Sequence, residues 1–290
     1  MIMLNRNLHV FINVAEKGSI TETANELYIS QPAVSKAIKN LEDELNLKLF
    51  HRDKRKGLIL TDVGHEILLQ ARQMVDLENK MYQTAFRSNN YIGGKVKIAS
   101  MPIITTKILA KVFYTFKTKY PYVTVELIEG SATEIRKAVE EHQADFGITS
   151  SPFGNLDYEV IIQDKMIAIT KEPLYNNQEV NLSENPERFI LCQSASEIIM
   201  ENLRPNNITI SKSTIVEQAG TVIALAKERN GIGIISTLVA DVVQNQLLHY
   251  PIVPDIKTDI AIVAHNLQDL TPVAMELKRL IIEFVKTSYT

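Results

Sequence analysis

The chain has 290 residues, of which 45% are hydrophobic and 22% are charged, and its formal net charge is −3. This composition is ordinary for a globular protein of two or three domains, and the charge excludes a histone-like polycation without excluding a DNA-binding protein. The single cysteine, Cys192, excludes an intrachain disulfide and a zinc cluster built from several cysteines.

The first predicted element is an amphipathic helix over Leu4–Lys17, which Gly18 is expected to end. Apolar residues recur along one side of this helix, so we interpret it as a scaffold for the helices that follow. The segment lacks the pattern of a signal sequence, and no apolar run in the chain approaches the roughly 18 residues of a membrane span. We therefore expect a cytoplasmic protein that does not contact a membrane.

Two short helices joined by a tight turn are predicted within Gly18–Phe50. Ser19 is followed three residues later by Glu22, which is typical of a capping box at a helix start. Ser30 can cap the second helix, and Pro32 is tolerated in its first turn because a proline there loses no helical hydrogen bond. The buried face of the second helix is expected at Val34, Ile38, Leu41 and Leu45.

The opposite face of this second helix carries small polar and basic side chains. Gln31, Ser35 and Lys39 form an i, i+4 row, and Lys36 lies beside them. Such groups can reach base edges and phosphates, so the pattern favours a helix-turn-helix whose second helix reads DNA. A helical hairpin with a solvated polar face is the alternative that spacing alone leaves open.

A β-hairpin wing is predicted next, because apolar strands at Lys48–Arg52 and Leu58–Leu60 flank a basic turn that ends in glycine. The turn contains Lys54, Arg55 and Lys56, three consecutive cations placed to meet phosphates or to enter the minor groove. A solvated charged turn is the alternative, and the neighbouring helix-turn-helix pattern favours DNA.

A long helix without proline is predicted over Asp62–Asn89. A long helix with an exposed apolar stripe needs a partner, so we interpret it as a dimer-forming linker, with packing on its own domain as the alternative. Two recognition helices related by a two-fold axis would read an inverted repeat. The stripe, which Glu78 interrupts, consists of Ile67, Ala71, Met74, Met81 and Ala85, and beside it Leu68, Val75 and Tyr82 repeat every seventh residue.

Strands alternate with helices after a polar boundary that ends at Gly93-Gly94. A β-α-β-α-β unit is predicted over Lys95–Thr149, and a second α/β set follows over Lys165–His265. A closing helix is expected over Thr271–Thr287. This alternation predicts two α/β subdomains with mainly parallel sheets, while Gly231-Ile232-Gly233 lacks the third glycine of a dinucleotide-binding fingerprint.

A dense set of motif residues runs through the first part of the chain: Gln31-Pro32-Ala33-Val34-Ser35, Ile38, Leu41-Glu42, Leu45, Leu49-Phe50, Arg52, Leu60-Thr61 and Gly64. This set resembles the amino-terminal signature of LysR-type transcriptional regulators, and the downstream architecture resembles that family as well. The resemblance implies an α-rich winged helix-turn-helix domain followed by an α/β effector domain of the type 2 periplasmic-binding-protein-like class. It places the domains at residues 1–61, 62–90 and 91–290, with one effector subdomain at 91–162 and 266–290 and the other at 163–265.

This resemblance implies a DNA-binding regulator of transcription that acts as a homo-oligomer, a dimer through the linker helix and a tetramer by analogy, with RNA polymerase as a further partner. No cofactor, metal site or catalytic constellation is expected, so the chain is not expected to be an enzyme. A solute-binding or sensor protein with an N-terminal protein-interaction module is the alternative. The expected DNA-contacting residues are Ser30, Gln31, Pro32, Ser35, Lys36, Lys39, Arg52, Lys54, Arg55, Lys56 and Thr61.

Small polar residues follow several predicted strands of the α/β region. Ligands bind outside the carboxyl ends of parallel strands, where hydroxyls and free N–H groups at helix starts suit a small carboxylate or an amino-acid-like anion. By resemblance, the effector is a small metabolite bound between the two subdomains. Each residue alone is more often an ordinary helix cap, so the hypothesis depends on their meeting in one cleft. The candidates are Ser100, Ser131, Thr149, Ser150, Gln193, Ser194 and Ser196.

Cys192 is expected at a strand end beside this cleft. A lone sulfur has no resolving partner for redox sensing, and free cysteines are commonly buried. We therefore interpret Cys192 as a buried core thiol.

Overall fold

The computed structural model describes residues 6–53, 57–88, 92–174, 179–203, 212–241 and 246–289 of the chain. The chain forms two compact units, one made of Met1–Gly94 with Glu141–Gln143 and the other of Lys95–Glu140 with Ala144–Thr290. We call the first the DNA-reading unit and the second the effector unit. Within the described residues, no helix is both long and apolar enough to cross a membrane.

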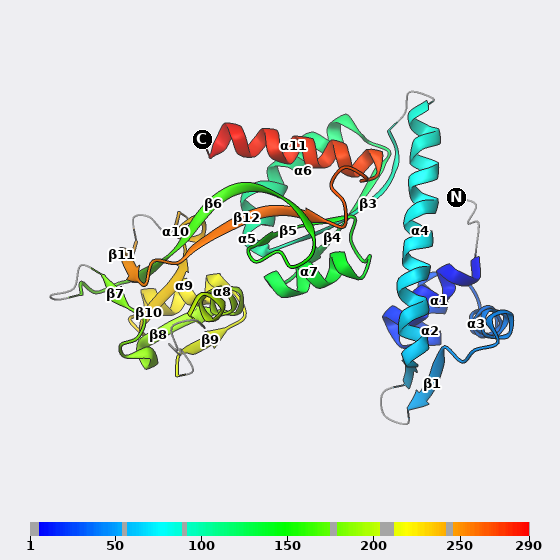
Figure 1. Cartoon of the computed structure of the whole chain (residues 1–290), viewed down its shortest axis with the longest axis horizontal. Coiled ribbons are helices and arrows are strands. Elements are labelled where there is room, and N and C mark those ends of the chain that lie inside the picture. The colour runs from blue at the N-terminus through cyan, green and yellow to red at the C-terminus, as the bar shows by residue number, and fades with distance from the viewer. Residues whose placement is uncertain are drawn as a thin grey trace. The chain divides into compact units, whose positions relative to one another are not determined.

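The DNA-reading unit contains the helices and the hairpin that the sequence predicts, which confirms the winged helix-turn-helix fold (Figure 1). Strands β1 and β2 pair antiparallel, with Phe50 opposite Leu60. The elements are α1 (Arg6–Lys17), α2 (Ile20–Glu26), α3 (Gln31–Leu45), β1 (Phe50–Asp53), β2 (Gly57–Leu60) and α4 (Asp62–Ser88).

The local signals in the sequence start and stop these helices as expected. Gly18 adopts the left-handed conformation (φ +63°) that glycine favours, and its N–H donates to Val14 O over 2.9 Å. The hydroxyl of Ser19 accepts from the N–H of Glu22 (3.2 Å), and that of Ser30 accepts from the N–H of Ala33 (3.3 Å).

The core of the DNA-reading unit forms between α1, α3, the wing and α4. Phe11 is fully buried and meets Phe50 edge to face, with their ring centres 5.6 Å apart. On α3, Val34 and Leu41 are buried as predicted, but the prediction for Leu45 is wrong, because 39% of it is exposed. Leu45 ends α3, and Asn46 then adopts the left-handed conformation and turns the chain away.

The effector unit is an α/β structure built around one continuous set of paired strands. Its elements before the middle of the chain are β3 (Gly94–Ser100), α5 (Pro102–Ile104), the π-helical turn η1 (Thr105–Leu109), α6 (Ala110–Lys119), β4 (Val123–Glu129), α7 (Ala132–Glu140), β5 (Phe146–Ser150) and β6 (Asp157–Thr170). Those that follow are β7 (Val180–Asn181), the 3₁₀ turn η2 (Pro186–Arg188), β8 (Phe189–Cys192), α8 (Gln193–Leu203), β9 (Thr214–Val216), α9 (Ala219–Lys227), β10 (Ile232–Ser236), α10 (Thr237–Ala240), β11 (Leu248–Val253), β12 (Lys257–Ala264) and α11 (Pro272–Ser288).

The strands lie in the order β4-β3-β5-β12-β6-β10-β8-β9, with β11 paired to β6 and β7. Parallel pairs β3–β5 in one half and β8–β9 and β8–β10 in the other match the predicted alternation. The two halves are joined by β6 and β12, which pair antiparallel and run side by side between them (Figure 1). The predicted subdomain boundaries near residues 163 and 265 stay a prediction.

Strand β6 is longer than the sequence indicates. The sequence predicts a strand only at Lys165–Thr170, where apolar residues dominate, whereas β6 begins at Asp157. Its first half is more polar and more exposed, so it carries a weaker strand signal, and pairing with β12 supplies the order.

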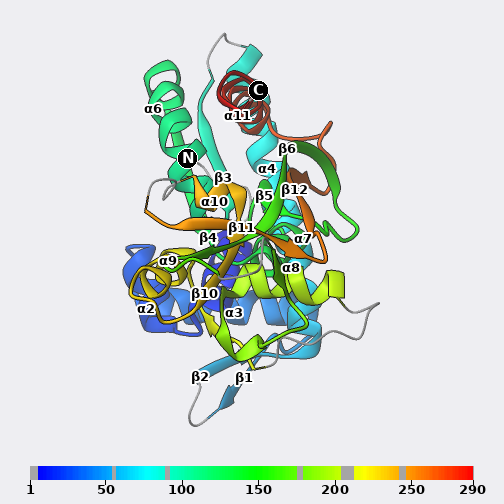
Figure 2. The same ribbon diagram turned by 90° about the vertical axis from the view of Figure 1, so that its left-hand side faces the viewer.

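The closing helix α11 covers one face of the sheet beside α6 (Figure 2). Its buried side includes Val273, Leu277, Ile281 and Val285. The Nζ atom of Lys111 on α6 lies 5.5 Å from the ring centre of Phe284 on α11. These contacts join the end of the chain to the first half of the effector unit.

The close approach at Gly64 generates a testable prediction. A Cβ atom there would lie 2.3 Å from Leu49 O, a backbone atom that cannot move aside. We expect Gly64→Ala to lower the free energy of unfolding by about 1–3 kcal/mol, measured by thermal unfolding. The matched control is Gly220→Ala on α9, where nothing lies within 4 Å, and that variant should be as stable as the natural chain or slightly more so. If Gly64→Ala and Gly220→Ala were equally stable, the expected clash between an alanine Cβ at position 64 and Leu49 O would be wrong.

Candidate functional site

The recognition helix α3 presents its polar face to solvent. Gln31, Ser35, Lys36 and Lys39 are all exposed, opposite the buried Val34 side. This arrangement leaves two cations and two small hydrogen-bonding groups free to meet a nucleic acid.

Ser30 and Pro32, at the start of α3, are exposed too, but both already have a structural role in starting the helix. The hydroxyl of Ser30 already accepts from the N–H of Ala33, so it serves as a helix cap. Pro32 lies in the first turn, as predicted. Contacts from these two residues to DNA stay a prediction.

A buried carboxylate ties the end of α3 to the wing. Glu42 is only 8% exposed, and its Oε1 accepts from the N–H of Leu49 at 2.9 Å. Its Oε2 accepts from the Nζ of Lys48 at 2.6 Å. Burial acts to raise the pKa of the Glu42 carboxyl, but the hydrogen bonds from Lys48, Leu49 and Phe50 outweigh it and lower that pKa below its ordinary value.

The sequence pattern does not predict this role of Glu42, because a glutamate in the middle of a charged stretch is usually solvated. The signal that could have found it is the position of Glu42, four residues after Ile38 and next to Leu41, on the inward side of α3.

Thr61 is held between the wing and α4. Its Oγ1 donates to Lys48 O at 2.8 Å and accepts from the N–H of Gly64 at 3.0 Å. The side chain therefore acts as an N-cap for α4 and links α4 to the segment before β1. A contact from Thr61 to the DNA backbone stays a prediction.

Arg52 extends from the middle of β1 and is exposed, with Leu58 opposite it across the hairpin. The remaining wing candidates, Lys54, Arg55 and Lys56, lie outside the described residues.

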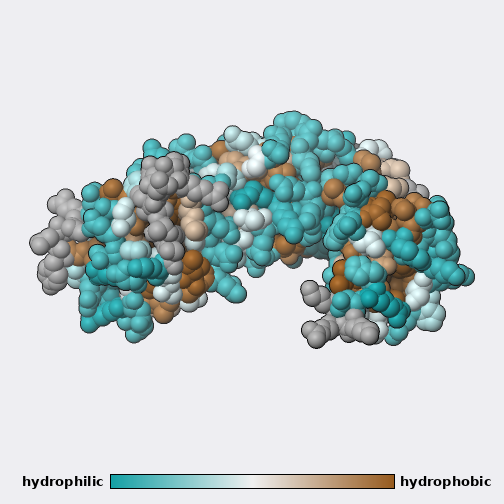
Figure 3. Space-filling model, turned by 60° about the horizontal axis from the view of Figure 1, so that its bottom comes forward, coloured by the Kyte–Doolittle hydropathy of each residue, from teal (hydrophilic) through white to brown (hydrophobic). Residues whose placement is uncertain are grey.

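The apolar residues that the sequence predicts along α4 differ in their exposure. Leu68 and Ala71 are buried against the DNA-reading unit itself. Met74, Leu77 and Met81, which follow further along the helix, are instead exposed. Apolar surface is visible on this unit in Figure 3.

Glu78, which interrupts the predicted stripe, has a partner of its own. Its Oε2 lies 2.9 Å from the Nε2 of His9 on α1, and both side chains are largely buried. This pair therefore fixes α4 to α1.

The effector candidates divide between the two faces of the sheet. Ser100 on β3 lies opposite Ile148 on β5, so Ser100, Ile148 and Ser150 share one face. Thr149 points to the other face, where its Oγ1 donates to Ala132 O at 3.3 Å. Sequence alone could not make this division, because it depends on strand register.

The start of α7 uses its own side chains to satisfy its backbone. Ser131 Oγ accepts from the N–H of Glu134 at 3.4 Å, and Glu134 Oε2 accepts from the N–H of Ser131 at 2.8 Å. These two bonds form a capping box, so the N–H that an anion was expected to find is occupied by a carboxylate. An anionic effector would have to displace Glu134 to bind there.

Helix α8 begins at Gln193, earlier than the sequence indicates, because these polar residues form its first turn rather than a loop. Gln193 is exposed, Ser194 is half-buried, and Ser196 is buried with its Oγ 3.7 Å from Met200 Sδ. On the facing helix α7, the hydroxyl of Thr133 donates to Glu197 Oε2 at 3.0 Å, so α7 and α8 meet across the two halves of the effector unit. Ser131 and Ser194 thus belong to neighbouring helix starts.

Cys192 is buried, as predicted. Burial raises the pKa of its thiol, and hydrogen bonding from the backbone N–H of Ala195 offsets this only in part. A thiol held in its protonated form reacts slowly with oxidants, which favours a structural role.

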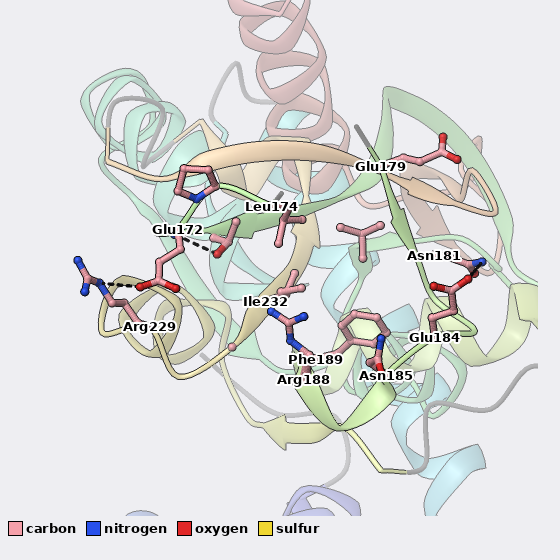
Figure 4. A pocket seen from close by; sticks show the side chains of 14 residues that line it. Glu172, Leu174, Glu179, Asn181, Glu184, Asn185, Arg188, Phe189, Arg229 and Ile232 are labelled. Carbon is pink, nitrogen blue, oxygen red and sulfur yellow. Dashed lines mark hydrogen bonds and ion pairs between the residues drawn. The ribbon is translucent and has the colours of Figure 1, made fainter. Parts of the chain in front are cut away.

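A hollow of about 360 Å³ lies elsewhere in the effector unit, at the beginnings of β8 and β10 (Figure 4). Its floor contains Phe189 and Ile232, and Arg188 points into it. Arg229 at its rim is paired with Glu172 at 3.5 Å. Because ligands in α/β sheets bind at the carboxyl ends of parallel strands, we do not assign the effector to this hollow.

Comparison with protein families and relatives agrees with this architecture. Residues 5–65 match the family of bacterial regulatory helix-turn-helix proteins described as lysR family, and residues 89–286 match the LysR substrate binding domain. The chain is 42% identical over 285 residues to YoaU of Bacillus subtilis strain 168, described as an uncharacterized HTH-type transcriptional regulator, covering 97% of this chain and 98% of that protein. It is 30% identical over 256 residues to CysL, an HTH-type transcriptional regulator of the same organism, covering 83% and 82%.

Two solved structures share the fold. A full-length OxyR variant from Pseudomonas aeruginosa, in which one cysteine is replaced by aspartate, matches with a TM-score of 0.72 at 17% identity, covering 99% of this chain and 95% of that chain. Full-length CbnR in complex with its target DNA matches with a TM-score of 0.58 at 19% identity, covering 97% and 99%. At these identities the likeness concerns the fold alone.

The buried carboxylate of Glu42 generates a second prediction. We expect Glu42→Gln to lower the free energy of unfolding at pH 7 by about 1–3 kcal/mol, because the charged acceptor is removed. Folding lowers the pKa of the Glu42 carboxyl below its ordinary value of 4.5. The stability that the charged Glu42 contributes is therefore fully present above pH 4.5 and is lost as the pH falls through the pKa of the folded protein. The difference between the two proteins, measured by denaturant unfolding, should therefore shrink in acid.

The control for this experiment is Lys48→Met, which removes the exposed partner and leaves the backbone hydrogen bonds of Glu42 intact. It should change stability much less than Glu42→Gln. Equal losses of stability in both variants would mean that the exposed ion pair, and not the buried carboxylate, holds the wing.

Proposed function

This chain belongs to the LysR family of DNA-binding transcriptional regulators, and on that premise we propose that it binds an inverted-repeat promoter site as a homo-oligomer and responds to a small metabolite in its effector unit. The relatives are transcriptional regulators, and the chain is a regulator and not an enzyme. The alternative of a solute-binding or sensor protein with an N-terminal interaction module is therefore set aside.

The observation that carries the proposed DNA contacts is the exposed polar face of α3. Gln31 and Ser35 are one helical turn apart and can both reach base edges in the major groove. Lys36 and Lys39 flank them as partners for phosphates. Arg52 and the cations of the wing turn would add contacts beside the recognition helix.

The proposed dimer rests on α4. Met74, Leu77 and Met81 follow one another at helical spacing and are about half exposed or more. An apolar face on a long helix is stabilised when a second copy covers it. A two-fold dimer also places two recognition helices where they can read the two halves of an inverted repeat.

The proposed effector site lies where the two halves of the effector unit meet. Strands β6 and β12 connect the halves, and Thr133 and Glu197 join α7 to α8 across them. A metabolite that binds more tightly to one arrangement of the halves shifts the equilibrium toward that arrangement. We propose that this shift alters how the DNA-reading units are presented to DNA.

The proposed DNA contacts predict two different classes of variant. Gln31→Ala and Ser35→Ala should relax the preference for individual base pairs, by about 1–3 kcal/mol each. Alanine at Lys54, Arg55 or Lys56 should weaken binding to every sequence and lower the slope of log affinity against log salt by about 1 for each phosphate left without its cation. Fluorescence anisotropy with a selected duplex and a scrambled duplex at several salt concentrations measures both effects.

Lys117→Ala on the effector unit is the control, since it removes an exposed cation without touching α3 or the wing. It should leave the salt slope unchanged. If the α3 variants and the wing variants weakened binding to the selected and the scrambled duplex equally, the assignment of base recognition to α3 and of phosphate binding to the wing would be wrong.

The proposed dimer predicts that a charge in the exposed apolar face of α4 separates the subunits. Leu77→Glu and Met81→Glu should each raise the dimer dissociation constant at least about tenfold, which corresponds to about 1.4 kcal/mol. Sedimentation velocity over a concentration series measures this change. The control is Tyr28→Glu, which alters an exposed aromatic residue of the same unit outside α4. An unchanged oligomer in the α4 variants would mean that another surface joins the subunits.

A further inference from the structure

Tyr28 lies in the turn between α2 and α3, and 96% of its surface is exposed. Aromatic side chains usually bury a large area in a core or in an interface. The next residue, Ile29, does so, because it packs against the core cluster that contains Val10 and Val34. The fold therefore gains almost nothing from the side chain of Tyr28, although this residue stands just before the recognition helix.

The backbone conformation of Tyr28 is strained for a tyrosine. Its φ is +52°, in the left-handed region where a Cβ atom crowds the following carbonyl oxygen. The N–H of Tyr28 donates to Asn25 O at 3.3 Å, and the next N–H, that of Ile29, donates to Ala24 O at 3.0 Å. These two bonds form the Schellman motif that ends a helix, and glycine is the usual residue at the position that Tyr28 occupies. The turn alone would therefore favour glycine there.

The turn has a defined place when a helix-turn-helix binds DNA. The first helix of the motif crosses the phosphate backbone, and the N-terminal residues of the second helix contact base edges in the major groove. Tyr28 connects these helices three residues before Gln31, so the two Cα atoms lie at most about 11 Å apart. The major groove is about 12 Å wide, so a residue at this distance from Gln31 can reach the phosphates at the edge of the groove.

The charges beside the turn are compatible with a phosphate group at the tip of Tyr28. Glu26 is the acidic residue nearest to Tyr28 in the sequence, and its Oε2 lies 2.8 Å from the Nζ of Lys17. This ion pair offsets the negative charge of Glu26 at the end of α2. The exposed Lys36 and Lys39 add positive charge on α3. A phenol hydroxyl has one O–H donor, and phosphate oxygens are acceptors.

We propose that Tyr28 contacts the DNA backbone, with its phenol hydroxyl donating a hydrogen bond to a phosphate oxygen at the edge of the groove that α3 reads. Tyrosine is among the side chains that proteins use for phosphate contacts, which position a protein on the duplex without reading its sequence. Because the phenol is neutral, this contact displaces no counterion and adds nothing to the salt dependence of binding. The inference rests on the proposed DNA contacts of α3 and adds a residue of the turn to them.

The test is fluorescence anisotropy of full-length Tyr28→Phe, which lacks only the hydroxyl, with the selected and the scrambled duplex over the same salt series. We expect Tyr28→Phe to weaken binding to both duplexes about tenfold, because a hydrogen bond to a charged group is lost. The slope of log affinity against log salt should equal that of the natural chain. The matched control is Tyr122→Phe on the effector unit, where Tyr122 is 76% exposed, and this variant should bind like the natural chain.

A second variant, Tyr28→Gly, separates DNA binding from folding. Glycine suits the left-handed conformation, so the unfolding temperature of Tyr28→Gly should equal or exceed that of the natural chain. Its affinity for both duplexes should fall at least as far as that of Tyr28→Phe, because the whole side chain is missing. A tyrosine with only a structural role in the turn would show the opposite result, with stability lost and affinity for DNA kept.

The remaining outcomes distinguish this inference from the proposed base contacts of α3. If Tyr28→Phe kept full affinity for both duplexes, the proposed contact between the phenol hydroxyl and a phosphate would be wrong. If it weakened binding to the selected duplex only, Tyr28 would read a base, which also overturns the inference. If Gln31→Ala left the preference for the selected duplex unchanged while Tyr28→Phe weakened binding to both, the proposed base contact of Gln31 would fail and the backbone contact of Tyr28 would stand.

Discussion

The antiparallel pairing of β6 with β12 is the constraint on which the effector unit depends. Two parallel-stranded halves each have their own helices, and the long pair of strands is what joins them into one sheet. Because side chains alternate along both strands, this pairing also decides which polar residues face each other. Asp164 and Thr258 are neighbours only through it, and the position of Ser150 follows from the next pair along.

The DNA-reading unit depends in the same way on one buried polar contact. Glu42 connects the inward face of α3 to the backbone that leads into the wing, so the recognition helix and the wing keep a fixed relation. Thr61 connects the same segment to α4. The recognition surface is therefore joined to the long helix through hydrogen-bonded groups and through the packing of Phe11 against Phe50.

Structural features that depend on neighbouring residues in the sequence could be predicted, whereas features that depend on contacts with distant segments could not. The caps at Ser19 and Ser30 and the capping box at Ser131 were predictable, because each bond joins residues three positions apart. The burial of Glu42, the exposure of Leu45 and the length of β6 were not, since each depends on a contact or a chain turn that periodicity does not encode. The apolar residues of α4 were recognised, but which of them are buried and which are exposed was not.

The sequence by itself determined the family, the order of the helices and strands, and the polar face of α3, because these follow from residue pattern at short range. Only the tertiary structure decided which effector candidates share a face. It separated Thr149 from Ser100 and Ser150, and it showed that Glu134 occupies the helix start where an anion was expected. The physical reason is that strand register and burial arise from pairing between segments far apart in the chain.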